Sequence, residues 1–531
     1  MTTARLACWL IACCGLACCA APAGGGDWPQ WGGSDARNMV SAEKDLPESF
    51  EPGRKSPSGG GIDLATTRNV RWAAKLGTQA YGNPTVAGGR VYVGTNDEEL
   101  DDPRFQSTRG GLVKCFDERD GKLLWQLVIP RRTGVPKDML LDHLGLGVCS
   151  SPTVEGERVY LVTSRAEVVC LDALGMANGN QGPFEAEALY GVPQGSAPVP
   201  PGPNDADILW RFDLLTEVPV WPQDAASCSI LVCGDFLYVC ASNGVDKSHD
   251  RVPLPEAPSL IVLDKRTGRM VGFDAEKIGR RLFHGEWSSP SLGVVGGQKL
   301  IFYGAGDGLC YAFAPLAAAA ASPTPLTKVW SFDCNPPDYK VVNGQKVNYR
   351  DGDKRRNKGN KGDGQFIGPS EIIATPVFYR DRVYVATGQD PAHGRGKGIL
   401  HCIDATRRGE IPTAAARWTY RDLDRTISTV SVADGLLYLA DVAGRLHCLD
   451  ADTGKPRWVY DTKAEIWGST LVADGKVYLG SKKGLHVFAH SPQMKLLAEV
   501  RTGSPVYCTP VAANGVLFVA SQRYLWAAEK K

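Results

Sequence analysis

The chain has 531 residues and a formal net charge of +1 at pH 7, so no overall field attracts nucleic acid or an anionic membrane. Its 60 glycines and 35 prolines favour a fold of strands and tight turns. Length alone suggests several domains, but internal repeats weaken that expectation because repeat folds grow one unit at a time.

Residues 1–23 read as an export signal. Arg5 precedes an uncharged apolar run over 6–19, and Ala21-Pro22-Ala23 offers a cleavage site. The run is too short for an ordinary membrane span, and no later stretch is long and apolar enough to be one. We expect a periplasmic or secreted protein without a transmembrane segment. Lipid anchoring at Cys19 is the alternative to simple cleavage.

Cysteines are numerous, but their places do not suggest a disulfide framework. Five of the 16 lie in the signal. Four others, Cys115, Cys170, Cys402 and Cys448, recur at one place in a repeated strand, so they should lie far apart as small buried hydrophobes. Cys228 and Cys240 could meet across a hairpin, although we favour free thiols. No CxxC pair or CxxCH haem motif occurs, and the sequence assigns no metal site.

Residues 24–68 form an N-terminal extension, and residues 69–531 carry a repeat. Its plainest copy has four β-rich runs, at 428–432, 436–440, 444–450 and 457–460, separated by Gly/Asp turns. We name these strands A to D. Eight copies align on the strand-B aromatic: Tyr92, Tyr160, Tyr238, Phe302, Tyr384, Tyr438, Tyr478 and Phe518. The last two spacings are 40 residues, which predicts an all-β, eight-bladed β-propeller of four-stranded antiparallel blades.

The last copy lacks a strand D, and an orphan strand at 69–72 supplies one. Trp72 in that strand matches a tryptophan found in five other D strands: Trp125, Trp210, Trp330, Trp418 and Trp458. We predict that the N-terminal strand completes the last blade and closes the ring, leaving no free sheet edge. The tryptophans are expected to pack between blades.

The turn between strands C and D carries a motif. Residues 449–458 read LDADTGKPRW, and related copies occur at 263–268 and 116–122. The motif resembles the DxxTGKxxW docking motif of the pyrroloquinoline-quinone (PQQ)-type propeller repeat. The opening at 27–33 is similar to that of exported quinoprotein-like propellers of planctomycetes. Blade four, with Ala314 in place of aspartate, and blade seven, with Ser491 at the turn, depart from the motif. We expect looser docking there.

Strand parity places the B–C and D–A loops on one face. Most insertions fall there, at 97–109, 131–147, 243–257, 276–286, 334–372 and 388–398. Long loops gathered on one face of a rigid scaffold favour binding, and we call this the loop face. The 176–207 insertion, between strands C and D, is expected on the opposite face as a solvated excursion.

The first residues of strand A should ring the central channel. Nine residues before the strand-B aromatic, or slightly further in blade four, lie Asn83, Ser151, Ser229, Ser289, Thr375, Thr429, Ser469 and Thr509. Two residues earlier, four blades carry the aromatics Tyr81, Trp287, Trp467 and Tyr507. The aromatics are candidates for a stacking pocket. The small polar residues are more simply explained as partners of backbone groups near the axis.

Polar clusters on the loop face add further candidates. They include Asp246, His284, Glu286, Asp390 and His393. Their oxygens could hold Ca²⁺, and a histidine could act as acid or base. Each cluster could equally be an ordinary turn.

Two functions fit the resemblance. The first is a noncatalytic binding or scaffold propeller of the cell envelope, similar to the lipoprotein propeller of the outer-membrane assembly machinery, with an envelope protein or a small ligand bound at the channel mouth. The second is an oxidoreductase that uses PQQ and Ca²⁺ on alcohols or sugars. The resemblance implies an adjacent-cysteine disulfide in many such alcohol dehydrogenases, and residues 24–531 contain no Cys-Cys pair. The binding function is therefore favoured, and no catalytic residue is assigned.

Overall fold

The structure is a computed structural model. It describes residues 25–531 except 58, 250, 343–344, 347–349, 352–353, 356–368 and 392–396. The predicted export signal, Cys19 and His393 therefore lie outside the described residues. Within the described residues, no helix has the length and apolar character needed to cross a bilayer.

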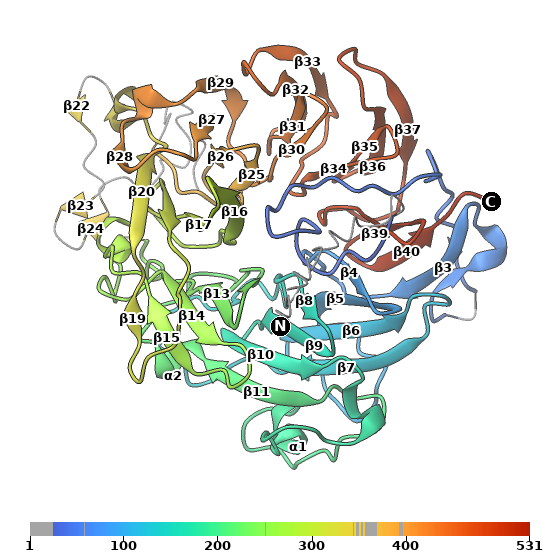
Figure 1. The fold of residues 1–531 in the computed structure, drawn as a ribbon. Helices are drawn as coiled ribbons and strands as arrows, with labels where there is room; N and C mark the ends of the chain where they lie inside the picture. Colours follow the sequence, from blue (N-terminus) through green and yellow to red (C-terminus); the bar gives the residue numbers. More distant parts are fainter. Residues whose placement is uncertain are drawn as a thin grey trace, which may run out of the picture.

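Eight four-stranded antiparallel blades surround a central axis (Figure 1). Blades one to four comprise β4 (Thr85–Ala87), β5 (Arg90–Asn96), β6 (Gly111–Asp117) and β7 (Leu123–Ile129); β8 (Thr153–Glu155), β9 (Arg158–Val162), β10 (Glu167–Asp172) and β11 (Ile208–Asp213); β12 (Leu231–Cys233), β13 (Phe236–Cys240), β14 (Leu260–Asp264) and β15 (Met270–Phe273); and β16 (Ser291–Val295), β17 (Gln298–Gly304), β18 (Leu309–Phe313) and β20 (Lys328–Asp333).

Blades five to eight comprise β25 (Val377–Tyr379), β26 (Arg382–Thr387), β27 (Lys397–Asp404) and β29 (Trp418–Asp424); β30 (Ser431–Ala433), β31 (Leu436–Ala440), β32 (Arg445–Asp450) and β33 (Pro456–Asp461); β34 (Thr470–Ala473), β35 (Lys476–Ser481), β36 (Gly484–Ala489) and β37 (Leu496–Val500); and β38 (Val511–Ala513), β39 (Val516–Ala520), β40 (Tyr524–Ala528) and β3 (Val70–Lys75). The eight-bladed prediction is confirmed.

Outside the blades the described elements are short. They include the pairs β1 (Arg54–Lys55) with β2 (Ile62–Asp63), β21 (Val341–Val342) with β22 (Gln345–Lys346), and β23 (Arg350–Asp351) with β24 (Lys354–Arg355), together with short 3-10 helices and the helices α1 (Glu187–Tyr190) and α2 (Leu214–Glu217).

The ring closes as predicted. Strand β3 pairs antiparallel with β40, with Ala73 opposite Trp526 and Lys75 opposite Tyr524. Figure 1 shows β3 beside the C-terminal strands. The first strand of the repeat region therefore completes, as its outer strand, a blade whose other strands come from the end of the sequence.

The strand-D tryptophans dock each blade onto the next. Six indole Nε1 groups donate to a carbonyl in the C–D turn of the following blade, in the pairs Trp72–Glu118, Trp125–Ala173, Trp210–Lys265, Trp330–Ala405, Trp418–Ala451 and Trp458–Ser491. The turn glycine makes this contact close. Gly454 has φ +69°, and a Cβ there would lie 2.4 Å from the Trp418 ring. The inter-blade role of these tryptophans is confirmed.

Where the docking motif departs, other contacts replace it. The turn of blade seven still accepts a hydrogen bond, 3.0 Å from Trp458 Nε1 to Ser491 O. In blade four the long C–D segment forms β19 (Thr324–Pro325), which pairs parallel with β15 of blade three. The strand β28 (Gly409–Ile411) of blade five is added to β20 of blade four in the same way. The expected looser docking is therefore offset by edge strands.

The 176–207 insertion also lies along the neighbouring blade, which corrects the expectation of a solvated excursion. Its Asp205 forms a parallel bridge with Gln126 on the outer strand of blade one. Arg104, in a B–C loop, forms an ion pair with Asp205 at 2.8 Å. The insertion thus runs from the C–D side up to the loop face, because the free outer edge of β7 offers backbone groups that need partners.

The N-terminal extension crosses strand A of every blade. We call residues 27–47 the strap. Its backbone or side chains hydrogen-bond one residue in or beside each A strand, in blade order Val86, Val154, Ile230, Leu292, Phe378, Val432, Val472 and Ala512. Arg37 is fully buried on the axis and donates to Ile230 O, Pro290 O and Trp31 O. Desolvation lowers its pKa to about 10. The strap therefore crosses the end of the ring opposite the loop face and contacts all eight blades.

Candidate functional site

An axial cavity of about 170 Å³ lies inside the ring. It is lined by the eight small polar residues at the start of the A strands and by the eight residues found two positions earlier, including Tyr81, Trp287, Trp467 and Tyr507. The predicted positions on the axis are confirmed. Trp31 of the strap also lines the cavity, and its Nε1 donates to Thr375 Oγ1 at 3.0 Å.

The small polar residues form a hydrogen-bonded belt around the axis. The backbone N–H of one blade donates to the side-chain oxygen of the next, as from Asn83 to Ser151 at 3.0 Å and from Thr429 to Ser469 at 2.8 Å. Seven such links run between neighbouring blades, the last from Thr509 N to Asn83 Oδ1. These oxygens satisfy backbone donors where strands crowd the axis, so their first role is structural.

Three of the four rim aromatics pack on one another. The ring centroids of Trp467 and Tyr507 are 4.8 Å apart, those of Tyr81 and Trp467 5.5 Å, and those of Tyr81 and Tyr507 6.0 Å, all in stacked orientations. Burial raises the pKa of Tyr507 to about 12, so its phenol stays neutral. Trp287 stands apart, with its edge against His284 and its Nε1 donating to Gln223 O at 3.1 Å. The rim therefore has an aromatic stack on one side and a single tryptophan elsewhere.

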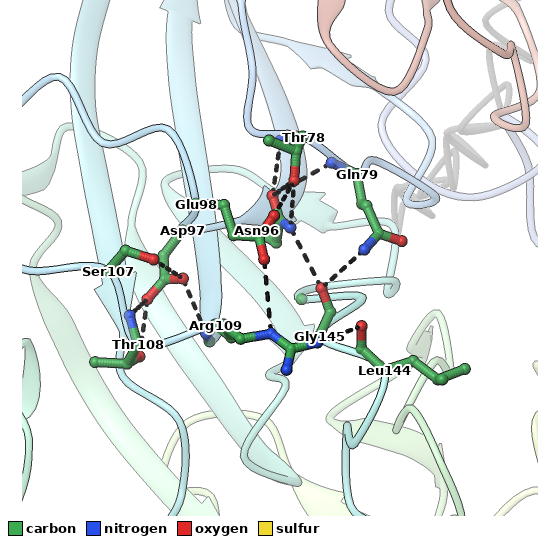
Figure 2. A network of polar contacts seen from close by, with 12 residues as sticks. Thr78, Gln79, Asn96, Asp97, Glu98, Ser107, Thr108, Arg109, Leu144 and Gly145 are labelled. Carbon is green, nitrogen blue, oxygen red and sulfur yellow. Dashed lines mark hydrogen bonds and ion pairs between the residues drawn. The ribbon is translucent and has the colours of Figure 1, made fainter.

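A polar network on the loop face holds Tyr81. Its hydroxyl donates to Gln79 Oε1 at 3.0 Å and accepts from Gln522 Nε2 at 3.1 Å. Figure 2 shows Gln79 and Asn96 both directed at the carbonyl of Gly145, which lies in the 131–147 loop. The B–C and D–A loops of blade one thus meet, as strand parity predicts, and the rim aromatic is positioned by both.

Two predicted polar candidates do not reach the cavity. Glu286 is 1% exposed, and it is absent from the cavity lining because alternation along the chain turns it away from the side that Trp287 faces. It lies near Asp274 and Asp307, and burial raises its pKa well above the usual range. Asp246 accepts from the backbone N–H and the hydroxyl of Ser248, which is an ordinary turn cap.

His284 and Asp390, in contrast, come together with His249, another histidine of the loop face, and with Glu371, which sequence reasoning missed. His284 Nδ1 lies 3.1 Å from Asp390 Oδ2, and His284 Nε2 lies 2.9 Å from His249 Nδ1. Glu371 completes a group in which one atom each of His284, Glu371 and Asp390 lie within 4.8 Å of one another. Glu371 was missed because its approach to His284 and Asp390 depends on the paths of loops from other segments, which the repeat does not determine.

A groove of about 580 Å³ lies on the loop face beside the aromatic stack. It is lined by Asp424, Arg425, Val442, Ala443, Lys463, Ala464 and Glu465. Glu465 Oε2 accepts from the Tyr507 hydroxyl at 3.4 Å, which connects the groove to the rim. Arg425 donates to the carbonyls of Asp390 and Pro391. The groove therefore runs between the rim and the Asp390 loop.

The family described as outer membrane protein assembly factor BamB matches residues 109–176 and 396–494. These stretches include the docking turns at 116–122 and 449–458. Within these stretches the chain carries repeats similar to those of that family. No curated protein matches the chain. The planctomycete-type grouping stays a prediction.

Three solved structures are similar to the chain, one of them with a TM-score above 0.5. A europium-containing methanol dehydrogenase is 12% identical with a TM-score of 0.53, covering 93% of this chain and 89% of that chain. BamB from Moraxella catarrhalis is 11% identical with a TM-score of 0.48, covering 86% and 96%. Quinohemoprotein alcohol dehydrogenase from Comamonas testosteroni is 15% identical with a TM-score of 0.46, covering 95% and 81%. At these identities the likeness concerns the fold, which does not decide function.

The residues around the axial cavity do not fit PQQ. The cofactor is a planar tricarboxylate, whereas none of the described residues that line this cavity is charged. A ring inserted between two aromatics needs about 7 Å between their planes, roughly twice an aromatic contact distance, and the stacked rings are already 4.8–6.0 Å apart. The cavity is also below the usual range for ligand sites, about 300–1,000 Å³.

Proposed function

We propose that this PQQ-like propeller is a binding module of the cell envelope, which receives a polypeptide segment of an envelope protein on its loop face. One observation carries the proposal. The strap and Trp31 cover one end of the axis, whereas the aromatic stack at the other end adjoins the groove of about 580 Å³ between Asp424 and Glu465. A partner is therefore expected on the loop face.

The chemistry of this region suits a polypeptide. Tyr81, Trp467 and Tyr507 offer stacked rings for an apolar or aromatic side chain. Trp467 Nε1 is buried and has no acceptor among the described residues, so a carbonyl of a bound segment would satisfy it. Arg425, Lys463, Asp424 and Glu465 place both signs of charge along the groove, which suits a polar backbone with mixed side chains. Residues 1–23 predict export, which would bring the protein to the compartment of its proposed envelope partner.

Site-specific photo-crosslinking in intact cells tests which face binds. Leu144 on the loop face and Met494 in the C–D turn of blade seven are 45% and 46% exposed, so they form a matched pair for a photoreactive residue. We expect discrete protein adducts from position 144 and from Lys463→photoreactive variants, but not from position 494. Equal adducts from both faces, or adducts from position 494 alone, would contradict the proposal.

The contribution of the rim tryptophans to partner binding is tested in the same cells. Trp467→Ala combined with Trp287→Ala should lower the yield of adducts from position 144 roughly tenfold, the effect of losing about 1.4 kcal/mol of binding free energy. Unchanged yield would exclude the rim from the binding surface.

The alternative, a PQQ-dependent dehydrogenase, has a direct test. Purified protein titrated with micromolar PQQ and Ca²⁺ should show no saturable visible chromophore and no dye reduction with alcohols or sugars. A bound chromophore with alcohol-dependent dye reduction would replace the binding function by an enzymatic one.

A further inference from the structure

We infer that His284, Glu371 and Asp390 form a binding site for a divalent first-row transition ion, with Zn²⁺ as its representative. One donor atom of each residue lies within 4.8 Å of the other two. The three residues come from different segments: the loop before blade four, the residues before blade five, and the loop after β26. The inference is independent of the proposed partner, since metal binding is measured without one.

The charges favour a cation at this position. Glu371 is 1% exposed and the Asp390 side chain 13% exposed, so both carboxylates are held close together in a weakly solvated place. Two such carboxylates repel each other, and a divalent ion between them converts the repulsion into attraction. Among the described residues, Arg425 lies nearby and donates to the backbone carbonyls of Asp390 and Pro391.

The donor set selects the ion. Ca²⁺ prefers six to eight oxygen ligands, and an imidazole nitrogen is a poor substitute for one of them. Zn²⁺ binds histidine nitrogen together with carboxylate oxygen, and sites with three protein ligands leave a further position for water or a ligand. One imidazole and two carboxylates match that pattern.

Contacts with three neighbouring side chains hold the imidazole of His284. His284 Nδ1 faces Asp390 Oδ2 at 3.1 Å, while its Nε2 lies 2.9 Å from His249 Nδ1. A metal-binding histidine usually has its other ring nitrogen hydrogen-bonded, which fixes its orientation and tautomer. The edge of Trp287, with ring centroids 5.3 Å apart, supports the same ring. His249 and Trp287 are therefore positioning residues.

The backbone at the three donors is also anchored. Val245 N–H donates to His284 O at 3.0 Å, and Gly388 N–H donates to Glu371 O at 3.3 Å. Ile372 N–H, next to Glu371, donates to Ala305 O at 3.2 Å. Such anchoring holds the donors close to their binding geometry before an ion arrives, which lowers the cost of binding.

Calorimetric titration of the full-length processed protein, without a histidine tag and after treatment with a chelator, tests the inference. We expect one equivalent of Zn²⁺ with saturable binding at micromolar concentration or tighter. Asp390→Asn and Glu371→Gln should each weaken binding about 100-fold, and His249→Gln about 10-fold to 100-fold with unchanged stoichiometry. Ca²⁺ in tenfold excess should not compete.

The pair His143–Asp224 supplies a matched control. It lies on the same face, with His143 Nδ1 2.6 Å from Asp224 Oδ1, and it is outside the three-residue group. Asp224→Asn should therefore leave Zn²⁺ affinity unchanged. Circular dichroism of each variant verifies folding before its affinity is compared.

A second measurement uses the unaltered protein, so that the test survives a variant that does not fold. Co²⁺ bound by nitrogen and oxygen gives weak visible bands, whereas Co²⁺ bound by a cysteine thiolate gives an intense near-ultraviolet band. We expect the weak bands alone. No saturable binding, wild-type affinity in both Asp390→Asn and Glu371→Gln, a preference for Ca²⁺, or a thiolate band would each overturn the inference.

Discussion

At the scale of single residues, the propeller is held by an indole that reaches into the neighbouring blade. Trp458 shows the arrangement: its ring packs between Tyr438 and Phe488, with centroids 5.9 and 6.0 Å away, and its Nε1 donates to Ser491 O. The rim tryptophan Trp467 lies in a different setting, half-buried and stacked on Tyr507. The two residues therefore allow docking and rim contributions to be compared directly.

Trp458→Ala should lower the free energy of unfolding by about 3–5 kcal/mol, because it removes a large buried aromatic and its hydrogen bond. Trp467→Ala should lower the free energy of unfolding by only about 1 kcal/mol, which is the contribution of a stacked aromatic pair. Denaturant unfolding followed by circular dichroism measures both. If Trp458→Ala costs no more than Trp467→Ala, the inter-blade docking role is wrong.

The sequence could predict the positions of those site residues whose distance from a repeated residue is fixed. Tyr81, Trp287, Trp467 and Tyr507 were placed on the axis because the repeat fixes their distance from the strand-B aromatic. Glu371 has no such reference, and its approach to Asp390 depends on the path of an insertion. His249 and His284 likewise meet through two loops whose conformations no repeat determines.

At the scale of elements, the strap is the feature that the sequence did not reveal. Residues 24–68 have no periodicity, because each strap residue contacts a different blade and so obeys no common rule. The edge strands β19 and β28 were missed for a similar reason, since two or three residues added in parallel carry no hydrophobic alternation. Strands A to D, in contrast, have both alternation and turn residues, and all eight copies were predictable.

Arg37→Ala tests the strap. The change removes a buried guanidinium that donates to Ile230 O and Pro290 O, at a cost of about 1.5–3 kcal/mol for hydrogen bonds from a charged group. Hydrogen exchange should accelerate at the amides of Leu292 and Phe378, which donate to the neighbouring strap carbonyls of Asp35 and Ala36. Exposed Lys44, changed to alanine, is the control. Unaltered exchange in Arg37→Ala would mean that the strap does not stabilise the A strands.

At the scale of the whole molecule, the pairing of β3 with β40 closes the ring. The sequence contains eight copies of the repeat, of which the last lacks strand D, and an orphan strand before the first copy. Pairing the orphan strand with the last copy gives every strand a partner. The sequence could therefore predict the closure. The path of the strap across the end of the ring opposite the loop face could not be predicted. It depends on contacts with all eight blades, which exist only in the closed ring.

A disulfide across the closure should strengthen the ring. Lys75 lies opposite Tyr524 and both are partly exposed, so the double variant Lys75→Cys, Tyr524→Cys can form one with little disturbance of the core. We expect oxidation to raise the free energy of unfolding by about 2–4 kcal/mol, seen as a higher melting temperature than in the reduced double variant. The native thiols in the described residues are buried apart from half-buried Cys149, which limits competing disulfides. Equal melting temperatures would show that unfolding does not begin at the closure.

The strap also constrains the order of assembly. Ser41 Oγ donates to Ala512 O, 471 positions later in the sequence, and contacts of such separation form slowly. Although this segment is synthesised before any blade, its contacts can form only after the eighth sheet has been made. The strap is therefore synthesised early but can reach its final position only after all eight blades have formed. Its docking indicates that the ring is complete.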